Sequence, residues 1–305
     1  MKLLACATLL LALPLSLLAY SKDPDSGLYF NDTKYTLGAP PDAALHHGMQ
    51  SALLVHPEDL PERAHYSNSS MARVWVHVVA PGGGAKPHRV EDFREQVFIV
   101  LAGAVDFTVE GERLAAAASD VGFIPPGPER SYVARGDQPA KVLQAEFVQK
   151  GPRPEKRGRA FVTSERVREL KHTGGEGYVT VAPNARQLVN PLSIVSYGAS
   201  HINASNALLL YHADIAAPRP FTANTVLARM GLSAYHPGGG TRWHFHADRE
   251  QLFVILAGKG LVEIGGNTIE VKAGDLVFAP RHVGHGYKTT GAEPLKFYEV
   301  EWGRN

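Results

Sequence analysis

The sequence contains almost no cysteine and no excess of charge of either sign. Its 305 residues include a single cysteine, Cys6, which excludes a disulfide framework, a cysteine-ligated zinc site and a cysteine nucleophile in the body of the protein. Lys and Arg number 31 against 30 Asp and Glu, which gives a formal net charge of +1. Because a nucleic-acid-binding protein needs a clustered basic surface, we expect no nucleic-acid partner.

Long hydrophobic runs are also absent, except at the N-terminus. Residues 3–18 form an apolar run behind Lys2 that is shorter than the roughly 20 residues a membrane-spanning helix needs. We interpret residues 1–20 as an export signal that is cut near Ala19, with an uncleaved anchor as the alternative. The mature chain is then expected to be secreted or periplasmic and to have no stable membrane span.

The sequence is rich in turn-forming residues and contains an internal repeat. Its 30 glycines and 21 prolines favour short strands joined by tight turns. The segment EQVFIVLAG at residues 95–103 returns as EQLFVILAG at residues 250–258, an offset of 155. The duplication spans about residues 46–150 and 201–305, so we expect two similar domains.

Each copy of the repeat is a series of short apolar runs bounded by Gly, Pro or Asp. Their spacing of about 8–12 residues predicts an all-β fold with a sandwich or barrel in each half. Between the copies, residues 163–172 predict a short helix with Ser164 as its N-cap. The expected organisation is an export signal at 1–20, an N-terminal domain with an extension at 21–150, a linker at 151–200 and a C-terminal domain at 201–305.

The second copy carries a histidine pattern typical of a metal site. His244 and His246 are two residues apart, so on a strand their side chains lie on one face. Two imidazoles on one face can share a divalent metal at about 2.0–2.1 Å. His285 follows a later strand and a proline turn. A lone histidine is more commonly a surface or core residue, but this set of three favours a metal site.

This arrangement resembles the two sequence motifs of the cupin superfamily. Gly238, His244 and His246 match the first motif at the right spacings, and Gly274, Pro280 and His285 match the second. His282 stands where the second motif has glycine, which affects the turn more than the metal site. Because both copies are covered, the chain is similar to a bicupin. The resemblance implies two tandem cupin barrels, of the double-stranded β-helix or jelly-roll type, with a short helical linker.

The fourth ligand comes from the Glu-Gln pair at residues 250–251. The glycine that closes the first cupin motif normally follows its ligand by seven positions, and Gly258 is seven positions after Gln251 and eight after Glu250. Some cupins similarly use a glutamine from such a pair. The interval favours Gln251, with Glu250 as the alternate ligand. Three histidines and a glutamine would leave the full charge of the divalent ion available as a Lewis acid.

The first copy has lost most of this ligand set. His88 is retained, but Val90 and Arg130 stand where the second copy has His246 and His285. A hydrophobic residue and a cation cannot ligate a metal, so we expect the N-terminal barrel to be metal-free and structural. An anionic group bound to Arg130 is the less favoured alternative.

The resemblance implies one divalent transition metal per chain (Mn, Fe, Ni, Co, Zn or Cu) and a small-molecule partner. The first hypothesis is an enzyme acting on a small oxygen-rich substrate, as an oxidoreductase of dioxygenase type or as a decarboxylase, lyase or isomerase. The second is a non-catalytic protein that binds a sugar or an organic acid. A storage-type structural bicupin is disfavoured, because such proteins usually lose the ligands. The resemblance also allows a homo-oligomer.

Further residues are candidates for the site because of strand parity or closeness to a ligand. Arginine forms bidentate pairs with carboxylates, and histidine and tyrosine can act as acid or base. For each, surface exposure or plain packing is the alternative. The candidates are Arg242 for a substrate carboxylate, His282 and Tyr287 as acid or base, and Phe253 and Ile255 as lining of the substrate pocket.

Overall fold

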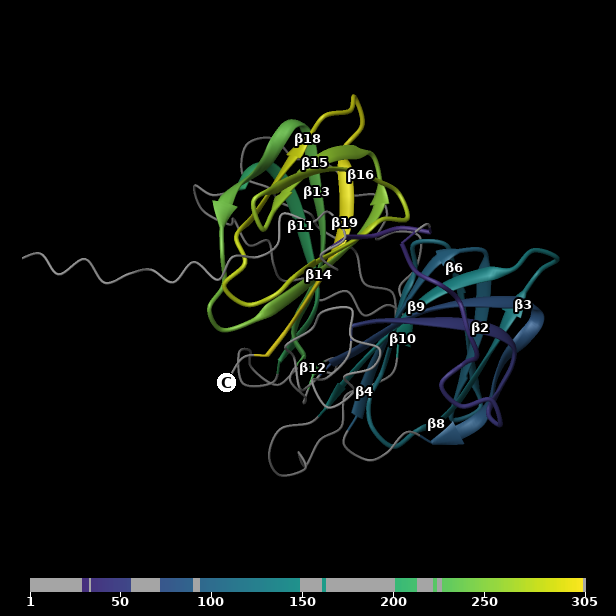
Figure 1. The fold of residues 1–305 in the computed structure, drawn as a ribbon. Coiled ribbons are helices and arrows are strands. Elements are labelled where there is room, and N and C mark those ends of the chain that lie inside the picture. Colours follow the sequence, from purple (N-terminus) through teal and green to yellow (C-terminus); the bar gives the residue numbers. More distant parts are fainter. Residues whose placement is uncertain are drawn as a thin grey trace, which may run out of the picture.

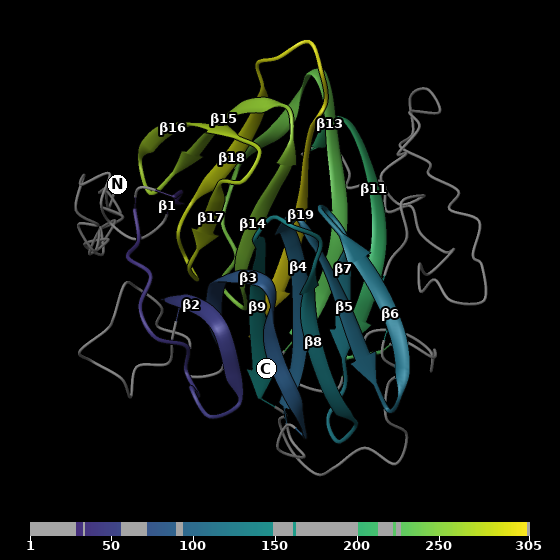
Figure 2. The ribbon, with the colours of Figure 1, turned by 90° about the vertical axis from the view of Figure 1, so that its right-hand side faces the viewer.

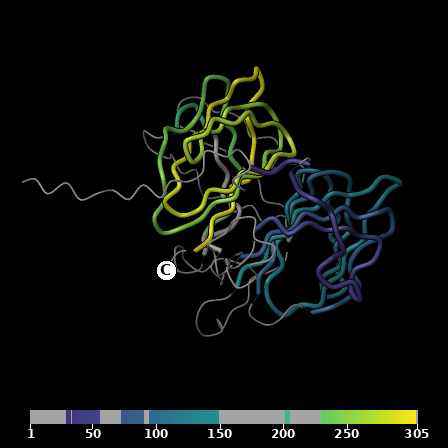
Figure 3. The backbone as a smooth tube through the Cα atoms, viewed as in Figure 1, coloured from purple at the N-terminus to yellow at the C-terminus, as the bar shows by residue number. Residues whose placement is uncertain are grey.

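The computed structural model describes residues 29–32, 34–55, 72–89, 94–148, 161–162, 201–212, 222–223 and 227–303. Within these ranges the chain is all β and forms two barrel-like sheets (Figure 1, Figure 3), which confirms the predicted fold class. The same ranges contain no helix of the length and hydrophobicity that a membrane crossing requires. The export signal expected at 1–20 and the short helix expected at 163–172 lie outside the described residues.

The first sheet has nine strands in the order β10-β7-β4-β9-β3-β8-β5-β6, with β2 paired to β3. Its strands are β2 (His46–Val55), β3 (Ala72–Arg89), β4 (Arg94–Ala102), β5 (Ala104–Val109), β6 (Glu112–Ala117), β7 (Val121–Ile124), β8 (Glu129–Arg135), β9 (Ala140–Val148) and β10 (Phe161–Val162).

The second sheet repeats this order with ten strands, β1-β17-β14-β19-β13-β18-β15-β16, and β11 pairs with β12 and β13. Its strands are β1 (Tyr29–Phe30), β11 (His201–His212), β12 (Thr222–Ala223), β13 (Leu227–His244), β14 (Glu250–Ala257), β15 (Lys259–Ile264), β16 (Asn267–Lys272), β17 (Leu276–Ala279), β18 (His285–Thr289) and β19 (Leu295–Trp302). The strands follow the same spatial order in both sheets, as expected for two copies of one repeated domain.

One long strand in each barrel runs through both layers of the sheet. The first part of β13 pairs with β19, and its last part pairs with β18. At the crossing, a Cβ on Gly240 would collide with the carbonyl oxygen of Tyr287, and one on Gly84 would collide with that of Tyr132. The repeated glycine triplet is therefore required by the close approach of two backbones. It delivers His244 to the end of β13, where the candidate site begins.

Burial patterns explain why these segments are strands. In β5 and β15, buried residues alternate with more exposed ones, as expected for a strand with one face on the core. β7 and β17 are buried along their whole length. Both are covered on their outer edge by a short strand, β10 on β7 and β1 on β17.

One of the two edge strands crosses to the other half of the chain. β1, which precedes the first barrel, pairs with β17 of the second barrel (Figure 2), and the Tyr29 hydroxyl donates to Asp275 over 3.0 Å. β10, which follows the first barrel, pairs with β7 of that barrel. No sequence pattern indicates the pairing of β1 with β17, which ties the N-terminal extension to the C-terminal half.

The two halves also share a hydrophobic core. The Phe147 and Trp302 rings lie 5.7 Å apart between centroids, and the Tyr298 hydroxyl donates to the Ser119 carbonyl over 2.7 Å. The largest core cluster contains buried residues from both sheets. Fully burying one large apolar side chain contributes about 1.5–3 kcal/mol, so this shared surface makes the halves interdependent.

Candidate metal centre

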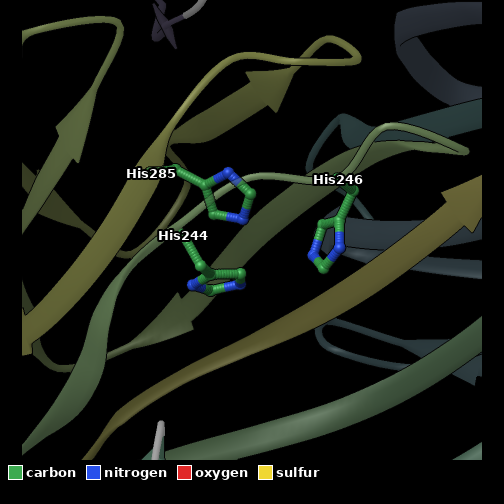
Figure 4. A group of neighbouring side chains, drawn as sticks. All are labelled: His244, His246 and His285. Atoms are coloured by element: carbon green, nitrogen blue, oxygen red, sulfur yellow. The ribbon is translucent and has the colours of Figure 1, made fainter. Parts of the chain in front are cut away.

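Two neighbouring strands of the second barrel bring three histidines together. His244 ends β13 and lies opposite His285, the first residue of β18. His246 follows two residues after His244. One ligand atom from each of these side chains lies within 4.8 Å of the other two, and the rings face a common space (Figure 4). We call these residues the His triad.

Hydrogen bonds fix the orientation of two of the triad rings. His244 Nδ1 lies 2.8 Å from the Arg242 carbonyl oxygen, and His285 Nδ1 lies 3.1 Å from that of Val283. A carbonyl can only accept, so each Nδ1 carries the hydrogen and each Nε2 keeps its lone pair. The Nε2 of His285 is buried without a hydrogen-bond partner among the described residues. It is therefore presented as a ligand atom.

Burial keeps two of the triad residues, His246 and His285, in the form that binds metals. It lowers the pKa of His246 to about 4 and that of His285 to about 3, because the charged imidazolium loses its hydration. The positive charge of Arg249 lowers the pKa of His246 further. At neutral pH both imidazoles are therefore neutral, as a metal ligand must be.

Strand parity puts Gln251 on the face of β14 that carries Phe253. Phe253, two residues further along β14, places its ring 5.6 Å from the His285 ring, and Gln251 has the same strand parity. The Gln251 amide nitrogen donates to Glu299 over 2.6 Å and to Glu301 over 2.7 Å. Its carbonyl oxygen is buried without a hydrogen-bond partner among the described residues. The predicted fourth ligand thus has its oxygen available.

Glu250, the alternate ligand, has the opposite strand parity. It lies opposite Trp302 in the pairing of β14 with β19 and is 1% exposed. The cluster of metal-binding groups found among the described residues consists of the three histidines and contains no carboxylate. The assignment of Gln251 as the fourth ligand, with Glu250 as the alternate, stays a prediction.

A buried acidic pair behind Gln251 was missed by the sequence analysis. Burial raises the pKa of Glu299 to about 8. Burial also acts to raise the pKa of Glu301, but Arg229 and Arg249, at 2.7 and 3.3 Å, outweigh it and lower this pKa below its ordinary value. Of the two carboxyl groups, Glu299 therefore binds a proton more readily than Glu301 does. The alternating carboxylates of LKFYEVEW were the only available signal, and that pattern is equally typical of a solvent-facing strand edge.

The wall of the site is aromatic. The Phe253 ring lies 4.7 Å from the Tyr287 ring and 5.6 Å from that of Phe297, and the Tyr287 ring lies 6.2 Å from that of His285. The Tyr287 hydroxyl is buried without a hydrogen-bond partner among the described residues, and burial raises its pKa well above the ordinary value. Ile255 is fully buried in the core one step further along β14. Phe253 and Tyr287 thus adjoin the triad, and Ile255 is more remote.

Arg242 and His282 contact the triad residues through their backbones, and their side chains are exposed. Arg242 is exposed and lines a cavity of about 440 Å³ together with Trp243, Glu263 and Lys288, and that cavity includes none of the triad in its lining. A register shift between Thr241 and His244 breaks the two-residue alternation that placed Arg242 beside His244.

His282 is exposed, with its ring 6.4 Å from that of Phe245. Its φ of +63° is in the left-handed region, which explains why the cupin motif has glycine at this position. Its backbone nitrogen donates to the His246 carbonyl over 2.8 Å. The turn at His282 therefore holds the segment that carries His246, whatever the role of its own side chain.

His201 is a further residue that the sequence analysis missed. Its ring lies 6.0 Å from the His244 ring and is stacked on Tyr235 at 6.2 Å. In the first barrel, His46 lies 6.0 Å from His88 in the same way. The repeat offset of 155 between His46 and His201 was the signal that could have identified this pair.

The residues present fit a divalent transition metal. The donor set is three imidazole nitrogens and one amide oxygen, all neutral, and such ligands suit the first-row metals. His285 Nε2 and Gln251 Oε1 are buried polar atoms that lack a hydrogen bond within the described part of the chain, and a metal would supply the missing partner. The His triad could therefore hold a divalent metal, with Gln251 as the predicted fourth ligand.

Comparison with known families and proteins agrees with this geometry. The cupin domain family matches twice, at residues 75–146 and 231–301. A curated relative, the oxalate-binding protein of Thermotoga maritima, is 32% identical over 75 residues, which cover 25% of this chain and 60% of that protein. The chain spans 60% or less of the length of the curated relatives it matches.

Solved structures match a larger share of this chain than the curated relatives do. Protein Ylba from E. coli superposes with a TM-score of 0.59 at 14% identity, covering 91% of both chains. The oxalate decarboxylase of Lactobacillus farciminis, solved as a formate complex, superposes with a TM-score of 0.52 at 17% identity, covering 91% of this chain and 86% of that one. At these identities the likeness concerns the fold.

Proposed function

The chain carries two cupin domains, and on this premise we propose that it is a metal-dependent enzyme acting on a small organic acid in its second barrel. The metal would be held by the His triad and the carbonyl oxygen of Gln251. The reaction classes proposed are a decarboxylation or another lyase or isomerase reaction, and an oxidation of dioxygenase type. Fold alone does not select among them.

The observation that carries this proposal is the pair of buried atoms left without hydrogen bonds. His285 Nε2 and Gln251 Oε1 belong to different strands, and both lack a partner in the described part of the chain. Leaving a buried polar atom unpaired costs about 1–3 kcal/mol. Two such atoms beside two further imidazoles are explained by a shared ligand, and a divalent metal is the ligand that these groups suit.

The surrounding residues have separate roles in the proposed chemistry. A bound metal would act as a Lewis acid that polarises a substrate oxygen. Glu299 and Glu301 accept hydrogen bonds from the Gln251 amide nitrogen, which would leave the amide oxygen for the metal. The rings of Phe253 and Tyr287 exclude water from one side of the site, and the Tyr287 hydroxyl retains its proton at neutral pH.

A small carboxylate is the proposed substrate class. A neutral ligand set leaves the full positive charge of the ion facing the substrate, which favours an anion. The name of the Thermotoga maritima relative, an oxalate-binding protein, supports the same class. That name also supports the second candidate function, a protein that binds an organic acid without converting it.

Metal analysis and turnover assays on one preparation test both candidates. The protein is purified without a metal-affinity tag, its metal content is measured, and it is reloaded separately with Mn, Fe, Ni, Co, Zn or Cu. Each form is offered oxalate and related short carboxylic acids while carbon dioxide, formate and oxygen are followed. His246→Ala is the test variant, and His88→Ala is its matched control in the first barrel.

Each result bears on one candidate. Turnover that is lost in His246→Ala and kept in His88→Ala supports the enzyme. Saturable acid binding without product, equally dependent on His246, supports the binding protein and contradicts the enzyme. Failure of every metal to bind contradicts both.

We also propose that the protein acts outside the cytoplasm. The apolar run at residues 3–18 supports this, because it has the length of a signal-peptide core. Sequencing the N-terminus of the protein recovered from its native host should find a start shortly after Ala19. A start at Met1 in a cytosolic fraction would contradict export.

A further inference from the structure

The first barrel places a buried arginine where the second barrel has a triad histidine. Arg130 lies opposite His88 in the pairing of β3 with β8, just as His285 lies opposite His244 in the pairing of β13 with β18. Arg130 is 4% exposed. The guanidinium therefore occupies the interior of the first barrel and is not a surface charge.

The buried guanidinium has unused hydrogen-bonding capacity. Arg130 Nη1 is buried and has no hydrogen-bond partner among the described residues, and the same holds for Nε of Arg73. A buried cation without a partner is strongly unfavourable. Burial lowers the pKa of Arg130 to about 10, so the group remains charged at neutral pH.

Both arginines line one cavity of about 160 Å³. Since a water molecule occupies about 30 Å³ in the liquid, this space suits an anion of a few non-hydrogen atoms. The imidazoles of His46 and His88, the Trp75 ring and the Gln144 amide also line it. The volume, the cation and the polar groups together describe a small binding site.

The two carboxylates that line the cavity, those of Glu146 and Asp42, form hydrogen bonds with groups other than Arg130. The Glu146 carboxylate accepts hydrogen bonds from Gln96 at 2.5 Å and from Gln144 at 3.1 Å, and it lies 3.5 Å from Arg94. Asp42 accepts hydrogen bonds from backbone nitrogens of its own turn, including that of Ala44 at 3.0 Å. Glu146 acts on Arg130 only as a more distant charge. Neither carboxylate supplies the hydrogen bond that Arg130 Nη1 lacks.

We propose that the first barrel binds a small carboxylate anion, held by the Arg130 guanidinium in the position where the second barrel would hold its metal. The planar guanidinium fits a carboxylate through paired hydrogen bonds. Arg73 and the histidines at the rim complete the anion's surroundings. The first barrel is then a ligand-binding domain and not only a structural one. This site does not depend on the proposed function of the second barrel.

Isothermal titration of the full chain with acetate, oxalate, malonate and inorganic phosphate tests the proposal. The His246→Ala background removes the contribution of the second barrel. One carboxylate should bind per chain, and Arg130→Gln should weaken the binding about 30-fold or more, because a buried charged hydrogen bond is lost. Arg135→Gln is the matched control, since this arginine of the same strand is half exposed, and binding should be unchanged.

Two further measurements keep the result interpretable. Thermal unfolding of Arg130→Gln establishes that the variant folds. If it does not, Arg130→Lys, which keeps the charge and loses the fork, should still bind the carboxylate, but more weakly than arginine does. Undiminished binding in Arg130→Gln or in Arg130→Lys, no binding of any carboxylate by the parent, or tighter binding of phosphate than of every carboxylate would overturn the assignment.

Discussion

Gln251 lies opposite Glu301 in the pairing of β14 with β19, and its amide nitrogen donates to the Glu301 carboxylate over 2.7 Å. The same nitrogen donates to Glu299 over 2.6 Å. Both amide hydrogens are therefore used, and only the carbonyl oxygen remains for a ligand. A glutamate at position 251 would direct a third carboxylate at this acidic pair. The neighbourhood thus explains why the chain has glutamine here.

The first prediction follows from this arrangement. Gln251→Ala should weaken metal binding more than tenfold, because it removes a ligand atom, whereas Glu250→Ala should weaken it less, since Glu250 has the opposite parity. Competition with a chelator of known affinity measures both constants. If Glu250→Ala strips the metal and Gln251→Ala leaves it bound, the ligand assignment is off by one residue.

Metal content should be about one ion per chain. His246→Val copies the residue of the first barrel into the second and should abolish binding, because it removes a nitrogen ligand. His88→Val should leave the metal content unchanged, since Arg130 already occupies a ligand position in the first barrel. Elemental analysis of the parent and the two variants measures the metal content per chain. Two ions per chain in the parent would contradict the prediction.

The metal-free protein should lose stability as the pH falls below about 6.5. In the unfolded chain a histidine takes up a proton near pH 6.5, whereas in the folded chain the pKa of His285 is about 3 and that of His246 about 4. Between these values the unfolded state binds more protons, so the free energy of unfolding decreases with falling pH. The loss is at most about 1.4 kcal/mol per pH unit for each group.

His77 adds to this acid sensitivity from the first barrel. Burial lowers its pKa to about 3, and its Nδ1 lies 2.7 Å from the Ser51 hydroxyl. Urea unfolding at pH 7, 6 and 5 measures the slope, and His285→Asn should make it shallower. A free energy of unfolding that does not vary over this range would contradict the buried neutral state of these histidines.

Tyr287→Phe should fold normally and be as stable as the parent, or more stable by up to about 1–3 kcal/mol. The reason is that its buried hydroxyl makes no hydrogen bond within the described residues. Tyr132→Phe, the equivalent change in the first barrel, removes only a 3.7 Å contact with the Met49 sulfur and is the control. A loss of turnover in Tyr287→Phe without loss of stability would assign the hydroxyl to the reaction. A clear destabilisation would reveal a partner for the hydroxyl.

Position 282 should tolerate glycine better than a β-branched residue. Because φ is +63° there, His282→Gly should be neutral or slightly stabilising, while His282→Val should cost about 1–3 kcal/mol. Thermal unfolding measures both. Equal stabilities would contradict backbone strain at this turn, and a stable His282→Gly variant without turnover would make the imidazole a participant.

The fold was predictable from the sequence because its signals are local and occur twice. Repeated runs such as EQVFIVLAG and EQLFVILAG identify the strands, and the histidine spacing identifies the triad. The contribution of Arg242 was harder to judge, since strand parity holds only along an unbroken ladder. The register shift between Thr241 and His244 interrupts that ladder, and no sequence pattern marks it.

Long-range features had no such signal. The burial of Glu299 and Glu301 depends on Arg229, which comes from a distant part of the chain, so LKFYEVEW alone could not indicate it. The sequence indicated only part of the site in the first barrel. The sequence showed that Arg130 replaces a ligand, but its burial and its unused hydrogen-bonding capacity required the structure.

The pairing of β1 with the second barrel also constrains the order of folding. Tyr29 and its partner Asp275 are 246 residues apart, so β1 has no edge to join until the second barrel has been synthesised. At roughly 5–20 residues per second, the first strand made would wait about 12–50 s for its pairing. Its two residues are too few to hold a structure alone during that time. Closure of the second barrel by β1 is therefore a late step, and a chain released before β18 and β19 are made would carry open sheet edges on β15 and β14, which pair with those strands. Such unpaired edges are templates for aggregation.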